Sequence, residues 1–360
     1  MNITLFIAVL FVLILVHELG HFLTAKWTKM KVEEFAIGFP PRLFSWRRGE
    51  TVFSLNLLPI GGFVKILGEN GVDEIPAEDK ARSFSSRPRL HQAIVLVAGV
   101  TMNILTAWLI FFAVGMIGQP TLATEGEPAD LTVIEVVEGS PAEKAGIPLG
   151  AVILKASAGD DARELKTPEE LTDFVTDHQT EEITLTYRYR DEANTAALTP
   201  SRGLIADDTE RMIIGLSTVP VTVVKEGPLQ ALVSATKRTS DSLVAITVGI
   251  FSLLASAFTF SADLSQVAGP IGIAGLVGDA AEFGITSLLI FVAMISLNLA
   301  VINLLPIPAL DGGRLLFVIA EAIIRRPLDP IWMSRVNFVG FSLLIVLMIA
   351  VTYNDIVKLV

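Results

Sequence analysis

Two histidines and a glutamate lie within one apolar stretch near the start of the chain. The stretch from Ile3 to Phe22 is almost unbroken in its hydrophobicity, yet it contains His17, Glu18 and His21. On a helix, residues four apart share a face, so the two imidazoles can bind one metal ion. Glu18 follows His17 directly and can accept a proton from a water molecule at that metal. The pattern His-Glu-x-x-His therefore predicts a zinc site with hydrolytic chemistry.

A histidine in an apolar helix is most often a satisfied core residue, but composition and position argue against that reading here. The chain has only 4 histidines among 360 residues. Random placement then produces on the order of 0.005 such motifs per chain. Ionisable side chains inside an apolar span destabilise it by several kcal/mol unless they are paired or bound to metal. We therefore favour the metal site.

A catalytic zinc needs a third protein ligand, since such sites have three protein ligands and a water molecule. The chain contains no cysteine, so the third ligand must be a histidine, an aspartate or a glutamate. Asp311 is the best candidate, because it lies where an apolar span ends after Pro306 and Pro308. The Gly-Gly pair that follows it lets the backbone open. Alone, this motif favours a plain helix exit; together with the two histidines, it favours ligation.

Composition places the chain in a membrane. Hydrophobic residues make up 52% of it, and its mean hydropathy is +0.60. Segments of about 20 apolar residues can cross a bilayer. We predict four transmembrane helices, at 1–25, 91–118, 286–313 and 336–354, the third of which carries Asp311. The first is predicted to be retained, because it lacks the basic start and the cleavage site of a signal peptide.

The net charge of −11 is distributed unevenly. Residues 119–242 contain 22 acidic and 11 basic residues, a net charge of −11, whereas residues 25–90 contain 11 basic and 8 acidic residues, a net charge of +3. Short basic connections stay in the cytoplasm, but a large domain is exported whatever its charge. We therefore expect 26–90 and the loop 314–335 to be cytoplasmic. No strongly basic patch stands out, so nucleic acid is not an expected partner.

Residues 35–69 have the pattern of β-hairpins. Short runs rich in Val, Phe, Ile and Leu alternate there with Pro-Pro, Arg-Gly and Gly-Gly pairs. Because this apolar segment lies beside the metal helix, we predict a membrane-associated β-loop rather than a structureless connection. The edge of such a sheet could pair with an extended substrate.

Residues 121–222 are predicted to form one soluble α+β domain of about 100 residues. Strand-like runs occupy 131–137, 183–189 and 211–216. Ser140 and Thr167 are predicted N-caps of two helices. The stretch GSPAEKAGIPLG (139–150) resembles the signature of PDZ domains, which bind an extended peptide between a strand and a helix.

Residues 227–280 are predicted to contain an interfacial helix and a glycine-rich turn. The segment 243–260 is apolar but rich in Ser, Thr and Ala. A fifth span there would place Asp311 on the wrong side of the membrane, so we favour a helix that lies along the membrane surface. The sequence AGPIGIAG (268–275) is the predicted turn.

Five motifs together resemble the site-2 protease family of intramembrane zinc metalloproteases, and most closely its bacterial members that regulate sigma factors. They are VHELGHF (16–22), NLLPIGGFVKILGE (56–69), GSPAEKAGI (139–147), GPIGIAG (269–275) and SLNLAVINLLPIPALDGG (296–313). The resemblance implies that His17, His21 and Asp311 bind Zn²⁺. It also implies that Glu18 is the catalytic acid/base.

The family further implies that Asn298 and Asn303 contact the unwound substrate helix and that 51–67 is the β-loop beside the site. This chain departs from the family pattern in two places. Val100 stands where members often have a proline, and Ala151 replaces the usual acidic residue of the PDZ signature. The best-known member carries two PDZ domains, and this chain has room for one.

The expected fold is a polytopic α-helical membrane protein with a membrane-associated β-hairpin region and one extracytoplasmic PDZ-like domain. The family implies a bacterial inner membrane location, an active site near the cytoplasmic face, and single-span substrates trimmed beforehand, such as anti-sigma factors or signal-peptide remnants. Two alternatives remain. A metal-cation transporter would have more acidic residues in its spans, and a non-catalytic PDZ scaffold would have lost Glu18 or a metal ligand.

Overall fold

The computed structural model describes residues 2–69, 75–124, 127–202, 211–259 and 268–358. It divides into two compact units, which are described separately below. The helical unit comprises Met1–Phe112, Leu232–Gly278 and Ile290–Val360. The sheet unit comprises Ala113–Ala231 and Asp279–Leu289.

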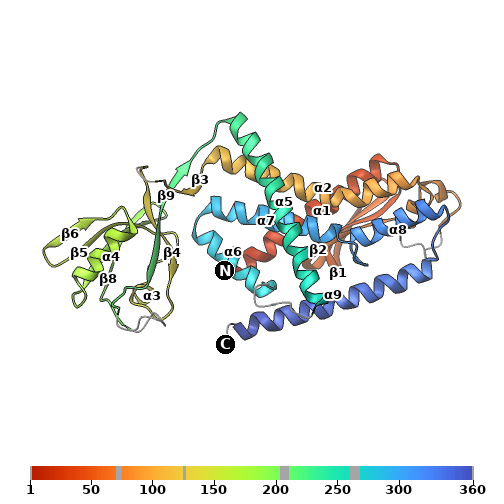
Figure 1. Ribbon diagram of the computed structural model, residues 1–360. Helices are drawn as coiled ribbons and strands as arrows, with labels where there is room; N and C mark the ends of the chain where they lie inside the picture. Colours follow the sequence, from red (N-terminus) through yellow and green to blue (C-terminus); the bar gives the residue numbers. More distant parts are fainter. Residues whose placement is uncertain (1, 70–74, 125–126, 203–210, 260–267, 359–360) are drawn as a thin grey trace. The chain divides into compact units, whose positions relative to one another are not determined.

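Within the described residues, five helices are long and apolar enough to cross a membrane (Figure 1). They are α1 (Asn2–Trp27), α2 (Arg89–Ile117), α5 (Pro228–Phe258), α7 (Ile285–Leu304) and α9 (Pro330–Lys358). Four of them fall on the predicted spans. The fifth, α5, is the segment that we predict to lie along the membrane surface, and it is the least hydrophobic of the five. Its interfacial placement stays a prediction.

The third predicted span is too long, and the loop predicted at 314–335 is largely helical. Helix α7 ends at Leu304, because the prolines at 306 and 308 cannot continue it. Asp311 begins a separate helix, α8 (Asp311–Ile324), whose apolar side buries Val318. The arginines of this segment are spread over both helices and the link between them: Arg314 lies in the first turn of α8, Arg325 and Arg326 directly follow its last residue, and Arg335 lies in α9.

The predicted glycine-rich turn at 268–275 is also wrong, because helix α6 (Pro270–Glu282) runs through it. Pro270 suits a first helical turn, where its missing N–H is not needed. The backbone N–H groups of Gly269 and Gly272 both donate to the carboxylate of Asp355 in α9, each over 2.9 Å. The cap of α6 thus comes from a distant helix. Residues 260–267 of the predicted interfacial region lie outside the described residues.

Small residues let the helices of the helical unit approach closely. A Cβ atom at Gly20 of α1 would lie 2.5 Å from the carbonyl oxygen of Ala98 in α2, so only glycine fits at this contact. Farther along α2, one apolar cluster joins it to α5 and α7; its buried members are Ala107, Phe111, Ala235, Ala293 and Leu297.

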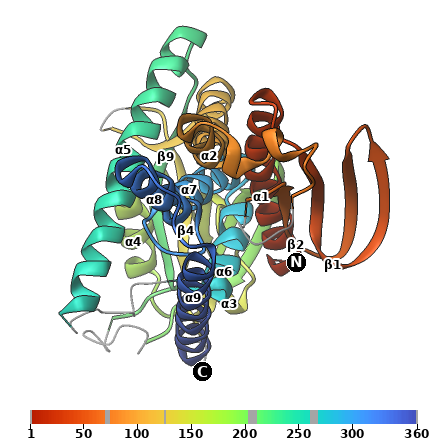
Figure 2. The same cartoon turned by 90° about the vertical axis from the view of Figure 1, so that its right-hand side faces the viewer.

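The predicted β-hairpin is confirmed as strands β1 (Val32–Arg48) and β2 (Thr51–Ile66), which stand beside α1 (Figure 2). Residues 34–37 pair with 62–65 on one side and with 52–55 on the other, so the long hairpin is folded back on itself. The final part of β2 therefore forms one edge of this small sheet. Two short 3-10 helices follow, η1 (Lys80–Arg82) and η2 (Phe84–Ser86).

The sheet unit has the expected α+β composition. Its strands are β3 (Gln119–Leu122), β4 (Asp130–Val136), β5 (Val152–Ala158), β6 (Asp161–Glu164), β7 (Ile183–Tyr189), β8 (Glu192–Leu198) and β9 (Leu216–Val224). They are ordered β3-β9-β4-β5-β7-β8, with β6 paired to β5. Helices α3 (Pro141–Lys144) and α4 (Pro168–Asp177) accompany them, and the buried core includes Leu131, Ile153, Phe174 and Leu185.

Both predicted N-caps of the sheet unit are confirmed. The side chain of Ser140 accepts from the N–H of Glu143, and that of Thr167 accepts from Glu170 in a capping box. Two predicted strands are also confirmed, but 211–216 is not one. The left-handed conformation of Gly215 (φ +81°) interrupts it, and β9 begins at the next residue.

The cap of α6 is open to a direct test by hydrogen exchange of the full chain in detergent. We expect Asp355→Ala to speed amide exchange in 270–282 about five- to tenfold, because loss of a cap destabilises a helix by about 1 kcal/mol. Tyr353→Phe, at a neighbouring exposed position, is the control. Equal exchange in both variants would show that α6 does not depend on Asp355.

Candidate metal centre and active site

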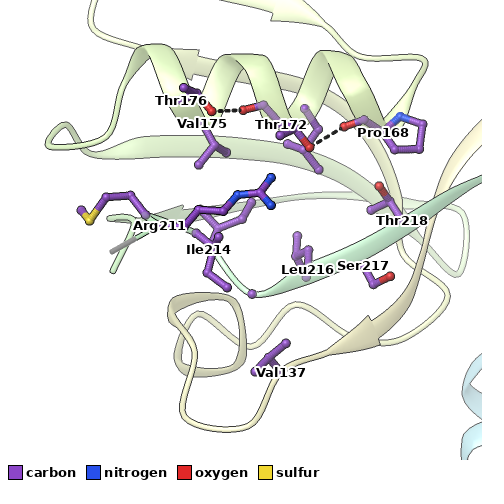
Figure 3. A pocket seen from close by; sticks show the side chains of 14 residues that line it. Val137, Pro168, Thr172, Val175, Thr176, Arg211, Ile214, Leu216, Ser217 and Thr218 are labelled. Carbon is purple, nitrogen blue, oxygen red and sulfur yellow. Dashed lines mark hydrogen bonds between the residues drawn. The ribbon is translucent and has the colours of Figure 1, made fainter. Parts of the chain in front are cut away.

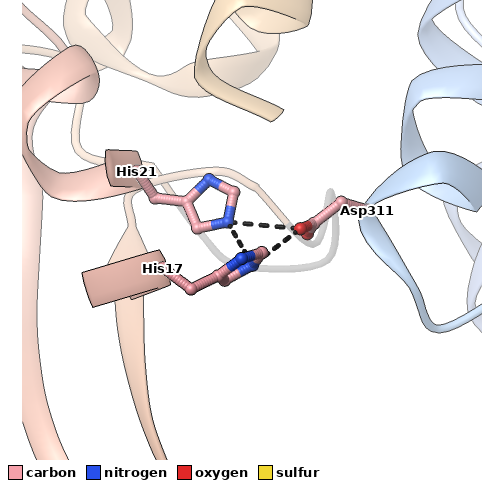
Figure 4. A group of neighbouring side chains, drawn as sticks. All are labelled: His17, His21 and Asp311. Carbon is pink, nitrogen blue, oxygen red and sulfur yellow. Dashed lines mark hydrogen bonds and ion pairs between the residues drawn. The ribbon is translucent and has the colours of Figure 1, made fainter. Parts of the chain in front are cut away.

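The three predicted metal ligands come together at one point, although they are far apart in the sequence. His17 and His21 project from the same face of α1, and Asp311 projects from the first turn of α8 (Figure 4). The Oδ2 atom of Asp311 lies 3.0 Å from His17 Nε2 and 3.3 Å from His21 Nε2. The two Nε2 atoms are 3.1 Å apart.

These separations fit a bound cation. Zinc ligands lie at about 2.0–2.1 Å from the ion, so neighbouring ligand atoms of a tetrahedral site are about 3.3 Å apart. Both histidines are buried, with exposures of 6% and 8%, and the site lies against apolar helices. Two imidazole lone pairs and a carboxylate oxygen repel one another unless a positive charge lies between them. The donor set, two nitrogens and one oxygen, is that of a catalytic zinc with one position open.

The backbone of α2 orients His21. Its Nδ1–H donates to the carbonyl oxygen of Val95 over 2.8 Å. This bond selects the tautomer in which Nε2 carries the lone pair, and Nε2 is the atom that faces Asp311. His21 is therefore held in its metal-binding form.

Asn103 of α2 plays the same part for His17. Its side-chain amide lies 3.4 Å from His17 Nδ1, while its Oδ1 atom is buried without a partner among the described residues. With the amide turned over, Oδ1 accepts from the His17 Nδ1–H and both groups are satisfied. His17 Nε2 then keeps its lone pair for the metal. The hydroxyl group of Ser296 in α7 donates to the main-chain carbonyl oxygen of Asn103 over 2.8 Å. This bond connects α2 to a third helix at the site.

Gly99 makes room for both imidazoles. A Cβ atom at this position would lie 2.5 Å from His21 Nε2 and 2.6 Å from His17 Nε2. The sequence-based prediction did not place Gly99 or Asn103 at the site. Their signal in the sequence is a glycine and an amide four residues apart, and hence on one face, within an otherwise apolar span.

A tight turn holds Asp311. Residues 305–310 fold back onto the start of α8, so a Cβ at Gly312 would lie 2.2 Å from the Leu304 carbonyl oxygen. A Cβ at Gly313 would be as close to the Ile307 carbonyl oxygen, at 2.3 Å. The glycine pair was predicted to let the backbone open at the end of the span. In the structure it instead lets the backbone of residues 304–307 approach the start of α8 closely. On the other side, α9 packs Gly340 against Pro308.

Glu18 borders a cavity of about 360 Å³ beside the metal ligands, the zinc-site cavity. His21 and Asp311 also line it, and residues 63–66 of β2 form the facing wall. Gly62 brings the strand close, since its Cβ would contact the Glu18 Cγ at 3.8 Å. Two candidate metal ligands, the Glu18 carboxylate and the end of β2 thus border one small space.

The two predicted substrate-binding asparagines lie on α7 and are half-buried. Asn298 donates to the Met294 carbonyl oxygen of its own helix over 2.9 Å. Neither Asn298 nor Asn303 is among the described residues that line the zinc-site cavity. Their contact with substrate stays a prediction.

The sheet unit has a groove of its own, of about 360 Å³ (Figure 3). It runs between α4 and the segment 211–218, with Val175 and Thr172 on the helix side and Ile214 and Leu216 on the other. The side chain of Arg211 also lines this groove (Figure 3). Peptide binding by the sheet unit, which the PDZ resemblance implies, stays a prediction.

Substitution of Gly99 tests the geometry of the metal centre. We expect Gly99→Ala to weaken zinc binding at least about a hundredfold, because the new methyl group overlaps both ligand nitrogens. Zinc content of the purified protein is the measurement. Gly249→Ala is the control, since a Cβ there meets nothing within 4 Å. Full zinc content in Gly99→Ala would contradict the site.

Comparison with known proteins agrees with the geometry. The model of peptidase family M50 matches residues 5–347. The zinc metalloprotease RasP of Shouchella clausii is 30% identical, over 98% of this chain and 98% of its own length. RasP of Oceanobacillus iheyensis is 29% identical over the same shares, and a relative from Clostridium perfringens is 36% identical over 96% of this chain and 95% of its own. The chain belongs to peptidase family M50.

Proposed function

We propose that this M50 peptidase is an intramembrane zinc endopeptidase that hydrolyses peptide bonds within transmembrane segments of single-span proteins. The observation that carries the proposal is the convergence of His17, His21 and Asp311 beside Glu18. The two histidines and Glu18 lie on α1, which is apolar enough to cross a membrane. Relatives that align over almost the whole chain are named zinc metalloproteases.

Bound at this site, zinc supplies Lewis-acid activation of water and of a peptide carbonyl. Glu18 is the general base and then the general acid. It lines the same cavity as two of the ligands, so it can accept a proton from water and return it to the leaving amine. Val95 and Asn103 keep the imidazoles in the form that binds metal.

A helical substrate must unwind before its carbonyls can be attacked, and the edge of β2 is suited to receive it. Residues 63–66 face the zinc-site cavity and pair on one side with β1. An extended chain can satisfy its backbone by pairing with the other side. Asn298 and Asn303 would take part where the substrate helix opens.

The hairpin itself is suited to a membrane-associated position. Large apolar side chains are exposed on it, among them Leu43 and Phe44 at 61% each and Leu57 at 52%. An apolar patch of this kind promotes aggregation when it faces water, whereas contact with lipid removes it from water. At the turn between β1 and β2, Glu50 forms an ion pair with Lys26, at the end of α1, over 2.8 Å. This supports a cytoplasmic edge near the metal centre.

The sheet unit would act as an extracytoplasmic PDZ-like filter. Its acidic character does not hinder export, and its groove between α4 and 211–218 could bind an extended chain. It would exclude substrates with bulky outer domains and admit those already trimmed. Bacterial anti-sigma factors and signal-peptide remnants are substrates of this kind. The topology that we propose has four spans and places the protein in the inner membrane.

The chemistry is tested with a single-span reporter that is truncated outside, mixed with the purified full chain in detergent. We expect Glu18→Gln to lower cleavage about 10²- to 10⁴-fold while zinc content stays the same, because only proton transfer is removed. Glu192→Gln, at the exposed first residue of β8 in the sheet unit, is the control. Undiminished cleavage by Glu18→Gln would refute the assigned role.

The filter is tested by replacing residues 121–222 with a flexible linker. We expect the shortened enzyme to cut a reporter that carries a folded outer domain, which the full chain leaves intact. Both enzymes should cut the trimmed reporter at similar rates, and this serves as the control for folding. If the shortened enzyme cuts the trimmed reporter but still rejects the bulky one, the sheet unit is not the filter.

A further inference from the structure

A second and larger cavity adjoins the zinc-site cavity in the helical unit. It measures about 540 Å³ and is lined by α8, the start of α9, the start of α2 and the segment that follows β2. We call it the α8 cavity. Glu69 and Arg314 line both cavities and form an ion pair with each other. This pair is therefore the wall that the two spaces share.

The charges in the α8 cavity are balanced. Besides the pair of Glu69 and Arg314, Arg89 forms an ion pair with Glu321 over 2.6 Å. Paired charges of this kind do not attract a further charged group strongly. Much of the remaining wall is apolar, with Phe317 and Val318 from α8 and Phe341 from α9. The cavity therefore offers contact area to a large apolar side chain.

The chain itself connects the two cavities through β2. Residues 63–66 line the zinc-site cavity, and Gly68 and Glu69, directly beyond the strand, line the α8 cavity. Residues 66–69 form a turn, in which the Glu69 N–H donates to the Ile66 carbonyl oxygen over 3.2 Å, and the ends of such a turn lie within about 7 Å of each other. An extended chain advances about 3.3 Å per residue, so about two residues cover that distance. A peptide paired with the edge of β2 beside the metal reaches the α8 cavity within that length.

We propose that the α8 cavity is a substrate subsite, which accepts a large apolar side chain two to four residues from the scissile bond on the flank toward Glu69. The inference rests on the proposed function. The subsite gives the enzyme a sequence preference within the unwound segment, at a position outside the zinc-site cavity. In this arrangement the substrate backbone passes over the ion pair of Glu69 and Arg314, which separates the two cavities.

Two neighbouring serines provide a matched pair of variants. Ser85 and Ser86 are both exposed, but Ser85 lines the α8 cavity and Ser86 is not among its lining residues. Ser85→Trp fills the cavity from its rim, and Ser86→Trp adds the same bulk beside it. Neither residue belongs to the metal centre or to the edge of β2.

The experiment uses a trimmed single-span reporter whose cut position has been located by mass spectrometry. Phe or Ala is then placed at each of the second to fourth positions on both flanks, and kcat/KM is measured for the full chain. We expect Phe to be preferred about tenfold or more at one of these positions, as for other apolar pockets. Ser85→Trp should lower kcat/KM for that Phe reporter about tenfold and leave the Ala reporter within about twofold. Ser86→Trp should keep the preference.

Other outcomes would overturn the proposal. Cleavage with no preference for Phe on either flank shows that the cavity takes no side chain of the substrate. An equal loss for both reporters in Ser85→Trp shows a structural role or occupancy by lipid. In both cases the proposed function stands, because the unmodified chain cleaves. If the unmodified chain cuts none of the reporters, the proposed function fails and the subsite fails with it.

Discussion

The helical unit depends on one constraint: two imidazole lone pairs and a carboxylate oxygen must stay within about 3 Å of one another in apolar surroundings. Several residues around the three side chains make this close approach possible. Gly99 removes the side chain that would occupy the space, and Gly312 and Gly313 let the turn before α8 close tightly enough to deliver Asp311. Val95 and Asn103 determine which nitrogen of each imidazole is free. A cation makes this arrangement favourable, and without one it is a cluster of mutually repelling acceptors.

The clustering of His17, His21 and Asp311 could be predicted from the sequence, because the motifs consist of rare residues at fixed spacing. His17, Glu18 and His21 stand out against an apolar helix, and Asp311 is marked by its prolines and glycines. Gly99 could not be recognised in the same way. Its importance depends on a distance across two helices, and a glycine in an apolar span has several more common explanations.

The errors in the predicted fold have the same origin. The segment 268–275 reads as a turn when only its own glycines are considered, yet it begins a helix because Asp355, more than eighty residues away, caps it. The segment 314–335 reads as a loop because it lies between two predicted spans, although the apolar periodicity of its first part allows an amphipathic helix that packs against the rest of the unit. Local sequence indicates only a local conformational preference, and tertiary contacts determine that both segments are helical.

The distance along the chain between the metal ligands has a consequence for biosynthesis. His17 and Asp311 are 294 positions apart, and the later one follows three more long helices and the whole sheet unit. A ribosome must therefore produce most of the protein before the centre can close. Until then, the emerging polypeptide lacks one of the three proposed metal ligands and, with it, the proposed catalytic centre. The membrane that receives it is thus protected from a protease that would otherwise become active during its own insertion.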